Sequence, residues 1–505
     1  MRFLKQSVSL GLALVLALSM TACDEPKAES SSAVTQSRET IATNPISLIS
    51  DTEFSKDTSN TSTESASYAS NPYENKTPVV SDVIWLNDNP RKLKVGSGQL
   101  FIEELNNGTA RLRDYSGNLV GEYDDVNVFS EGLAAVQKGG KWGYIDTKGQ
   151  LVISPEYDDT NSFAKGLAAV QKGGKWGYID TKGQFVISPE YDGANNFSEG
   201  LACVQKGGKW GCIDTKGQVV IPLEYDSAQF VFENLVMVYD GTYVSLIDNQ
   251  GNVVFEPGSV MGITYLSGNF AIAVENEKIG YIDADGNYVI PAEYDVGYHF
   301  YDGFAAVEKD GKWGVVNTQG KVVVPLEYDA VNSFIVDGLA CVSRDGKYGF
   351  VDTEGNIVIS FEYDMAYSFS EGLARVKKDG KWGYIGTDGQ VVIPLEYSRV
   401  DDFFKGFALV EKDGKWGCID TMGQFVFPPE YQEVSYPVVL LPQGKADVFY
   451  NGLAIVKKDG KWGVIDKSNQ LVLPLDYNKC EIVNHGELIF VKKGESWGFC
   501  TVTWH

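Results

Sequence analysis

Paired carboxylates recur along this chain in the tripeptide Glu-Tyr-Asp, the residue combination with the clearest capacity for chemistry. Two neighbouring carboxylates can serve as acid and base in glycoside hydrolysis or bind Ca²⁺. Catalysis, however, needs one unequal pair in one cleft, whereas this pair returns in unit after unit. We therefore interpret the Asp as a turn cap and the Tyr as a packing residue between units. The copies include Glu156–Asp158, Glu190–Asp192, Glu224–Asp226, Glu293–Asp295, Glu327–Asp329 and Glu362–Asp364.

Other catalytic and metal-binding patterns are missing from the sequence. Only three histidines occur, His299, His485 and His505. No Cys/His cluster has zinc spacing, and no calcium loop, Gly-rich phosphate loop or Gly-x-Ser-x-Gly elbow is present. His299 takes a linker position that elsewhere holds mostly Ser or Asn, and His485 lies in the last, irregular unit. We interpret both as structural variation. We expect no metal, no cofactor and no catalytic residue.

The N-terminus has the pattern of an export signal. Arg2 and Lys5 precede an apolar run from Leu10 to Leu18, which is too short to span a bilayer. Small residues then lead to Cys23, and residues 1–22 resemble a bacterial lipoprotein signal peptide, although Met20 stands where Leu is usual. The resemblance implies that Cys23 is lipidated and becomes the first residue of the mature chain. Ordinary secretion with a free Cys23 is the alternative.

Residues 23–95 are rich in Ser, Thr and Asn and poor in large apolar residues. Such a composition cannot bury enough surface to offset its ordering entropy, so we expect a disordered tether. Trp85 marks either the first ordered contact or a further part of the tether. A lipid on Cys23 would anchor the chain to a membrane without spanning it.

Self-similarity dominates residues 96–505, where we count about twelve units. Copies of Trp-Gly are mostly 34 or 35 residues apart, with an insertion near residues 436–447. A fixed period in this range is typical of solenoids or propellers. The tryptophans are Trp142, Trp176, Trp210, Trp313, Trp382, Trp416, Trp462 and Trp497.

One unit, residues 129–160, shows the pattern of three strands. The runs GLAAV, WGYID and QLVIS are separated by KGGK and TKG, and YDDVNVF is a possible fourth strand. Gly-Gly between apolar runs predicts a two-residue hairpin, because a type I′ turn needs positive φ at both positions. That register places Trp142 and Tyr144 on one face and Val136 and Ile145 on the other. Both faces are apolar, as stacked units require.

The same register places Cys203 opposite Cys212 across the Gly207-Gly208 turn, with Cα atoms about 4.5 Å apart. This distance is at the short end of the disulfide range, and an exported protein favours disulfides. A cross-strand disulfide and two buried thiols remain equal alternatives.

The other cysteines are assigned in the same way. Cys341 and Cys418 face Phe350 and Leu409 respectively, so we expect them to be core thiols. Cys480 and Cys500 lie in the last two units and could pair with each other.

The run GLAAVQKGGKWGYIDTKGQLVISPEYDD resembles the WG-repeat (KWG) family over residues 100–505. Members of this family resemble bacterial envelope or secreted proteins, and the resemblance implies no activity, ligand or catalytic residue. The recurrence of Trp-Gly in nearly every unit favours a packing role for the tryptophans over ligand stacking. In this interpretation, Gly lets a neighbour's side chain approach closely.

We expect an all-β fold of tandem β-meander repeats. Small residues in the first strand favour propeller-like blades. The repeat is shorter than the usual blade of about 40–45 residues, and twelve exceeds the usual range of about four to eight blades. An open β-hairpin solenoid or superhelix is therefore the alternative.

The formal charge of −25 argues against nucleic-acid binding, which needs clustered Lys and Arg. Two function classes remain. The first is an exported lipoprotein, anchored at the cell surface or in the periplasm, that acts as a non-enzymatic binding or scaffold module for a protein or glycan. The second is an envelope hydrolase or lyase acting on glycan, with its site in an irregular unit.

Overall fold

The computed structural model describes residues 76, 78–86, 90–232, 234–255, 260–267, 270–283, 285–331, 335–436, 447–483 and 486–505. Cys23 and His485 lie outside these residues, as does most of the predicted insertion. Within the described ranges, no helix has the length and hydropathy needed to cross a bilayer.

The strands form twelve small antiparallel sheets, each called a blade here and numbered along the chain. Blade 1 consists of β3 (Lys92–Val95), β4 (Leu100–Glu104), β5 (Ala110–Asp114) and β6 (Leu119–Tyr123), and blade 2 of β7 (Asp125–Ser130), β8 (Leu133–Lys138), β9 (Lys141–Asp146) and β10 (Leu151–Tyr157). Blade 3 consists of β11 (Asp159–Thr160), β12 (Leu167–Lys172), β13 (Lys175–Asp180) and β14 (Phe185–Tyr191), and blade 4 of β15 (Gly193–Ala194), β16 (Leu201–Lys206), β17 (Lys209–Asp214) and β18 (Val219–Tyr225).

Blade 5 consists of β19 (Ser227–Phe232), β20 (Leu235–Tyr239), β21 (Val244–Asp248) and β22 (Val253–Phe255), and blade 6 of β23 (Val260–Ser267), β24 (Phe270–Glu275), β25 (Lys278–Asp283) and β26 (Tyr288–Tyr294). Blade 7 consists of β27 (Val296–Gly297), β28 (Phe304–Lys309), β29 (Lys312–Asn317) and β30 (Val322–Tyr328), and blade 8 of β31 (Ala330–Val331), β32 (Leu339–Arg344), β33 (Lys347–Asp352) and β34 (Ile357–Tyr363).

Blade 9 consists of β35 (Met365–Ser370), β36 (Leu373–Lys378), β37 (Lys381–Gly386) and β38 (Val391–Tyr397), and blade 10 of β39 (Arg399–Val400), β40 (Phe407–Lys412), β41 (Lys415–Asp420) and β42 (Phe425–Tyr431). Blade 11 consists of β43 (Glu433–Ser435), β44 (Leu453–Lys458), β45 (Lys461–Asp466) and β46 (Leu471–Tyr477). Blade 12 consists of β47 (Lys479–Val483), β48 (Leu488–Lys493) and β49 (Ser496–Trp504), together with β1 (Pro78–Val80) and β2 (Ile84–Trp85) from the start of the described chain.

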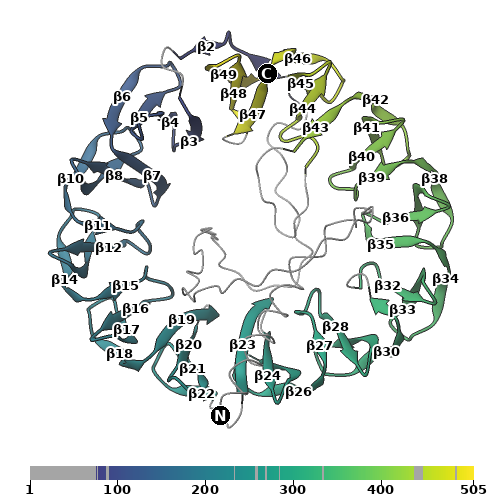
Figure 1. Cartoon of the computed structure of the whole chain (residues 1–505), viewed down its shortest axis with the longest axis horizontal. Coiled ribbons are helices and arrows are strands. Elements are labelled where there is room, and N and C mark those ends of the chain that lie inside the picture. The colour runs from purple at the N-terminus through teal and green to yellow at the C-terminus, as the bar shows by residue number, and fades with distance from the viewer. Residues whose placement is uncertain are drawn as a thin grey trace, which may run out of the picture. The chain divides into compact units, whose positions relative to one another are not determined.

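These blades follow one another around a closed ring, with the first strand of each blade innermost and the last outermost (Figure 1). The fold is therefore an all-β, twelve-bladed propeller, and the open stack is excluded. The YDDVNVF segment does supply a fourth strand, β7. The ring closes because β1 and β2 pair with β49, so blade 12 contains both ends of the described chain.

Closure also corrects the boundary of the predicted tether. β1, β2 and β3 lie within residues 78–95, so the folded ring begins before residue 96. Trp85 pairs with Gly498 in blade 12 and belongs to the ring. The signal for these strands is weak, because β1 and β2 have only three and two residues and their partner lies at the other end of the sequence.

The hydrophobic core lies in the interfaces between successive blades, which we call seams. The hairpin registers are as predicted, with Gln137 opposite Trp142 and Ala134 opposite Ile145. The Tyr144 face packs against blade 3, and the Ile145 face packs against blade 1. Each blade therefore buries both faces, which is why the period-two pattern of the sequence is apolar on both sides.

The glycine of Trp-Gly serves its own blade rather than a neighbour. A Cβ on Gly177 would lie 2.5 Å from the carbonyl oxygen of Ile187, on the outer strand β14 of the same blade. The pairing of β13 with β14 is irregular here, with register shifts on both sides of Tyr178. The glycine thus admits a bulge of the outer strand, and the predicted approach of a neighbouring side chain is wrong.

Candidate functional site

Five of the repeated Asp residues join two blades. The Asp192 carboxylate accepts a hydrogen bond from the Gly207 amide of the blade 4 hairpin turn (2.7 Å) and pairs with Lys175 of blade 3. The ion pair with Lys175 and the bond from Gly207 lower the pKa of Asp192. The Asp caps a turn, as the sequence indicated, and the turn belongs to the next blade. The same pattern holds at Asp158, Asp295, Asp329 and Asp364.

The Glu of most of these tripeptides also forms an ion pair across a seam. Glu190 of blade 3 pairs with Lys206 of blade 4, the residue before the hairpin turn, at 2.7 Å. Other Glu–Lys or Glu–Arg pairs of this kind are Glu156–Lys172, Glu293–Lys309, Glu327–Arg344, Glu362–Lys378, Glu396–Lys412 and Glu430–Lys458. Carboxylates paired with cations in this way tie neighbouring blades together at these seams.

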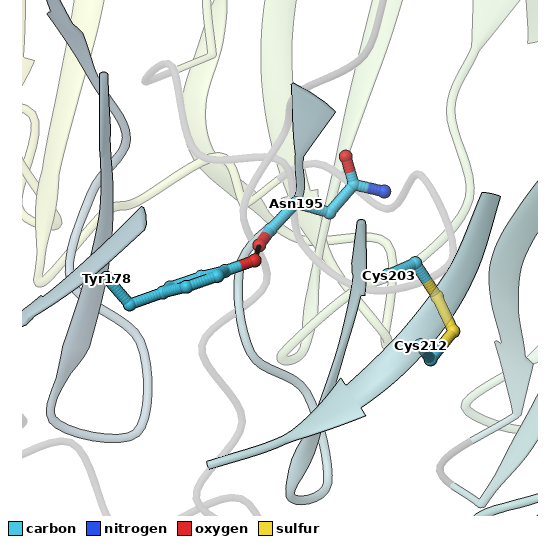
Figure 2. The surroundings of a disulfide bond; sticks show 4 residues. All are labelled: Tyr178, Asn195, Cys203 and Cys212. Carbon is cyan, nitrogen blue, oxygen red and sulfur yellow. Dashed lines mark hydrogen bonds between the residues drawn. A yellow bond between two sulfur atoms is a disulfide. The ribbon is translucent and has the colours of Figure 1, made fainter. Parts of the chain in front are cut away.

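Buried tyrosines provide the uncharged bonds of the seams. The Tyr178 hydroxyl of blade 3 donates to the carbonyl oxygen of Asn195 in blade 4, at 2.7 Å (Figure 2). Its ring meets Phe197 edge-on, with ring centroids 4.7 Å apart. Burial raises the pKa of Tyr178, so the hydroxyl stays protonated and remains a donor. Tyr144, Tyr281 and Tyr384 make the same bond.

The eight predicted packing tryptophans lie at the ends of the third strands, beside the hairpin turns. Trp176 stands opposite Gln171 on one side and Tyr191 on the other. Most of these indoles are half-buried and line the seam clusters, whereas Trp382 and Trp497 are fully buried. The largest wholly buried side chains are tyrosines and phenylalanines. The tryptophans therefore cover the edges of the seams, and the tyrosines fill their centres.

Cys203 and Cys212 lie opposite each other on β16 and β17, and their sulfur atoms are joined in a disulfide (Figure 2). Their Cα atoms are 4.0 Å apart. Both side chains are fully buried in the seam with blade 5. Blades 2 and 3 have Ala and Tyr at these two positions.

The four other cysteines of the described ring are free and buried. Cys341 and Cys418 stand opposite Phe350 and Leu409, as the register predicted. Cys480 and Cys500 line one cluster but are not bonded to each other.

The regular pattern breaks in blade 9, at Arg375. The Arg375 guanidinium pairs with Asp402 of blade 10 (Nε to Oδ1, 2.8 Å) and donates to the Val400 carbonyl oxygen (3.2 Å). Its Cζ lies 3.8 Å from the centroid of the Tyr367 ring. The equivalent positions of the other blades carry Ile102, Ala135, Ala169, Cys203, Met237, Ile272, Ala306, Cys341, Leu409, Ile455 and Phe490. Arg375 is thus the one charged residue at this strand position.

Blade 11 adds further polar contacts beside this one. The Tyr436 hydroxyl donates to the Asp401 carboxylate of blade 10. Burial, and the nearby Asp401 charge, raise the pKa of Tyr436. Lys405 of blade 10 pairs with the buried Asp447 at 2.8 Å. Tyr436 and Asp447 are the first and last residues of the predicted insertion, so both of its ends bond to one linker of blade 10.

We call these seven residues the polar sector: Tyr367, Arg375, Asp401, Asp402, Lys405, Tyr436 and Asp447. They come from the inner and second strands of blades 9–11 and from the linkers beside them, on the inner side of the ring (Figure 1). The sequence did carry a signal, because GLARV replaces GLAAV and Asp-Asp replaces the usual Asn-Ser. A comparison of equivalent positions across units would have found it.

Among the described residues, no group of three or more His, Cys, Asp or Glu side chains could hold a metal ion. His299, on the linker after β27 in blade 7, keeps much of its surface exposed, and desolvation of the imidazole by the neighbouring protein lowers its pKa.

The fold and its seams define a β-propeller built from one repeat. The family model of the WG containing repeat matches residues 121–142, 142–176, 176–210, 210–241, 279–313, 313–348, 348–382, 382–416, 416–438, 444–462 and 462–497. This chain therefore belongs to the WG-repeat family. No curated protein sequence matches it significantly.

Several solved structures share part of the architecture at low identity. BamB from Moraxella catarrhalis is 13% identical, with 56% of this chain and 98% of that chain covered and a TM-score of 0.26. The extracellular domain of BT3049 from B. thetaiotaomicron is 10% identical, with 80% and 70% covered and a TM-score of 0.21. PorZ, a surface component of the type-IX secretion system of Porphyromonas gingivalis, is 6% identical, with 81% and 79% covered and a TM-score of 0.22. TM-scores this low carry no inference about function.

Proposed function

We propose that this chain is an exported lipoprotein, anchored to the cell envelope through Cys23, whose propeller is a non-enzymatic binding or scaffold module for a protein or glycan. The seam contacts carry the proposal. The repeated carboxylates form ties between blades, and the polar sector brings partly exposed charges of both signs into the strand pattern and linkers of blades 9 and 10. A rigid ring with one distinct sector suits recognition better than turnover.

The polar sector has the composition of a recognition surface. Arg375 and Tyr367 present a cation stacked on an aromatic ring, a pairing common in interfaces. The Asp402 and Lys405 side chains are 42% and 43% exposed, so both signs of charge are accessible. Such groups can hydrogen-bond to sugar hydroxyls or to a peptide backbone.

Affinity capture from solubilised envelope tests the binding role. The bait is the lipidated chain, compared with an Arg375→Ala/Asp402→Ala variant, which removes both partners of one pair. A Glu190→Gln/Lys206→Gln variant at a regular seam is the matched control. We expect the sector variant to lose at least tenfold in recovery of a partner that the wild type and the control both retain. Equal recovery by all three baits would place the binding surface elsewhere.

Glycan-active catalysis is the second candidate, because Asp401 and Asp402 lie together in an irregular unit beside Tyr436. Incubation with isolated envelope glycans, followed by detection of new reducing ends or unsaturated sugars, tests it. Release that is abolished by Asp402→Asn would replace the binding proposal with an enzyme.

The anchor is tested separately. Mass spectrometry of the N-terminal peptide is expected to show diacyl or triacyl modification of Cys23. A Cys23→Ser chain is expected to move from the membrane fraction to the soluble fraction. An unmodified Cys23 would indicate ordinary secretion instead.

A further inference from the structure

The seam between blade 12 and blade 1 differs from the other seams in its covalent context. Successive blades elsewhere are joined by a short linker, so their contacts are local in sequence. Blade 12 combines β47–β49 from the end of the chain with β1 and β2 from its start. Within this blade the Thr501 amide donates to the Ser81 hydroxyl although the two residues are 420 apart in sequence. This seam forms only when the two ends of the ring meet, which makes it the slowest contact to form by loop closure.

Because the blades are alike, the face of blade 1 could pack against blade 12 of its own chain or against a blade of a second copy. Each blade has one face that fits the blade before it and one that fits the blade after it. Until the ring closes, the free face of blade 1 is uncovered, and so is the free face of blade 12. A second copy of this chain presents the same two faces, and head-to-tail contacts of this kind generate open arrays. Misassembly between repeats is a characteristic failure of such proteins.

The free face of blade 1 carries a buried ion pair that regular seams lack. The Glu103 carboxylate is 0% exposed and lies 2.8 Å from Nε of Arg113, whose side chain is 15% exposed. At the equivalent positions blade 2 has Val136 and Ile145, both fully buried. Arg113 also donates to the Gly117 carbonyl oxygen at 2.9 Å.

The residues around this pair place it against blade 12. Phe101 stands opposite Arg113 in the β4–β5 pairing and therefore lies on the same face. Its ring contacts Phe490 and Phe499 of blade 12, with ring centroids 5.7 and 4.7 Å away. Trp497, which is 4% exposed, completes this cluster. The indoles at the equivalent position are half-buried in most other blades.

We propose that the Glu103–Arg113 pair, with Phe101, matches the face of blade 1 to blade 12 and so selects closure within one chain over association with a second copy. A buried ion pair is a poor stabiliser, because the desolvation of two charges opposes their attraction. Its best-attested use is the choice of register and partner. Docking on an ill-matched surface would desolvate the two charges without the packing of Phe101 against Phe490 and Phe499 that accompanies them here.

Refolding of mixed chains tests this inference. Mature Cys23→Ser chains, labelled separately with donor and acceptor dyes, are unfolded, mixed at micromolar concentration and refolded. The variant Glu103→Val/Arg113→Ile carries the residues of a regular seam. We expect wild type to refold as monomer, and the variant to show at least a fivefold larger fraction of mixed dimers and higher species by energy transfer and light scattering. A Glu190→Val/Lys206→Ile control at a regular seam is expected to stay monomeric.

Two results would overturn the inference: a double variant as monomeric as wild type, or a control that associates equally. If the double variant does not regain native circular dichroism, Glu103→Gln answers the same question with nearly unchanged volume. Refolded Glu103→Gln chains with no increase in mixed species would also exclude the proposed role. These readouts do not depend on lipid or ligand, so they are independent of the proposed function.

Discussion

The Tyr178 hydroxyl donates a hydrogen bond to the Asn195 carbonyl oxygen across the seam between blades 3 and 4, at 2.7 Å. The bond joins the third strand of one blade to the inner linker of the next. It places a polar group at the centre of an apolar seam without leaving it unsatisfied. Repeated at other seams, it fixes the distance between blades.

Tyr178→Phe is expected to cost about 0.5–1.5 kcal/mol in the free energy of unfolding, because one buried hydrogen bond is lost with little change of shape. Urea unfolding followed by tryptophan fluorescence measures the change. Tyr243→Phe is the control, since that ring is 44% exposed. An equal loss in both variants would show that the bond across the seam contributes nothing specific.

Gly177→Ala is expected to destabilise the ring by about 1–3 kcal/mol, because the new Cβ would overlap the backbone of the outer strand. The nearest atom is the Ile187 oxygen, 2.5 Å from the Cβ position. Gly193→Ala serves as the control, since its nearest contact would be an ordinary 3.4 Å. Thermal unfolding by circular dichroism compares the two. A neutral Gly177→Ala would mean that the bulge of β14 moves freely.

Lowering the pH is expected to destabilise several seams of the ring at the same time. The folded-state pKa values of Asp158, Asp192, Asp295, Asp329 and Asp364 are lowered, chiefly by their lysine partners. A lowered pKa contributes stability above the ordinary carboxyl pKa of about 3.9, and this is lost as the pH falls through the folded value.

The thermal midpoint should therefore fall as the pH is lowered from about 5 to 3, near and below the ordinary carboxyl pKa. Asp192→Asn is expected to show a smaller drop than wild type over the same interval. A midpoint independent of pH across this range would contradict the role of these carboxylates.

Reduction is expected to weaken blade 4 selectively. Loss of the Cys203–Cys212 disulfide should cost about 2–4 kcal/mol. Mass spectrometry without reductant is expected to find the two thiols absent. The variant Cys203→Ala/Cys212→Tyr restores the residues of blades 2 and 3 and is expected to fold with no response to dithiothreitol. Free thiols at both positions in the oxidised protein would contradict the disulfide.

Local sequence patterns predicted most of this fold because most of its contacts are local. Gly-Gly and Asp-Gly turns fixed the hairpin register, and from it followed the opposed pair Cys203 and Cys212 and the two apolar faces. The number of units followed from the spacing of Trp-Gly.

Contacts between distant parts of the chain were harder to predict. β1 and β2 are too short to have a pattern of their own, and their partner β49 lies at the far end of the sequence. Closure therefore could not be separated from an open stack. Arg375 and Asp402 are visible in the sequence as departures from the repeat, but their pairing follows only when blades 9 and 10 lie side by side. The role of the Trp-Gly glycine depended on a bulge that register counting does not reveal.

A closed ring of twelve blades shares one full turn among its seams. Loss or gain of a single repeat would oblige every remaining seam to change its angle at once, including seams far from the altered unit. The number of repeats and the curvature of the ring therefore change together. A change in the number of repeats therefore first gives a ring whose seams fit poorly. Where neighbouring units are nearly identical, as blades 2 and 3 are, the mismatch is small.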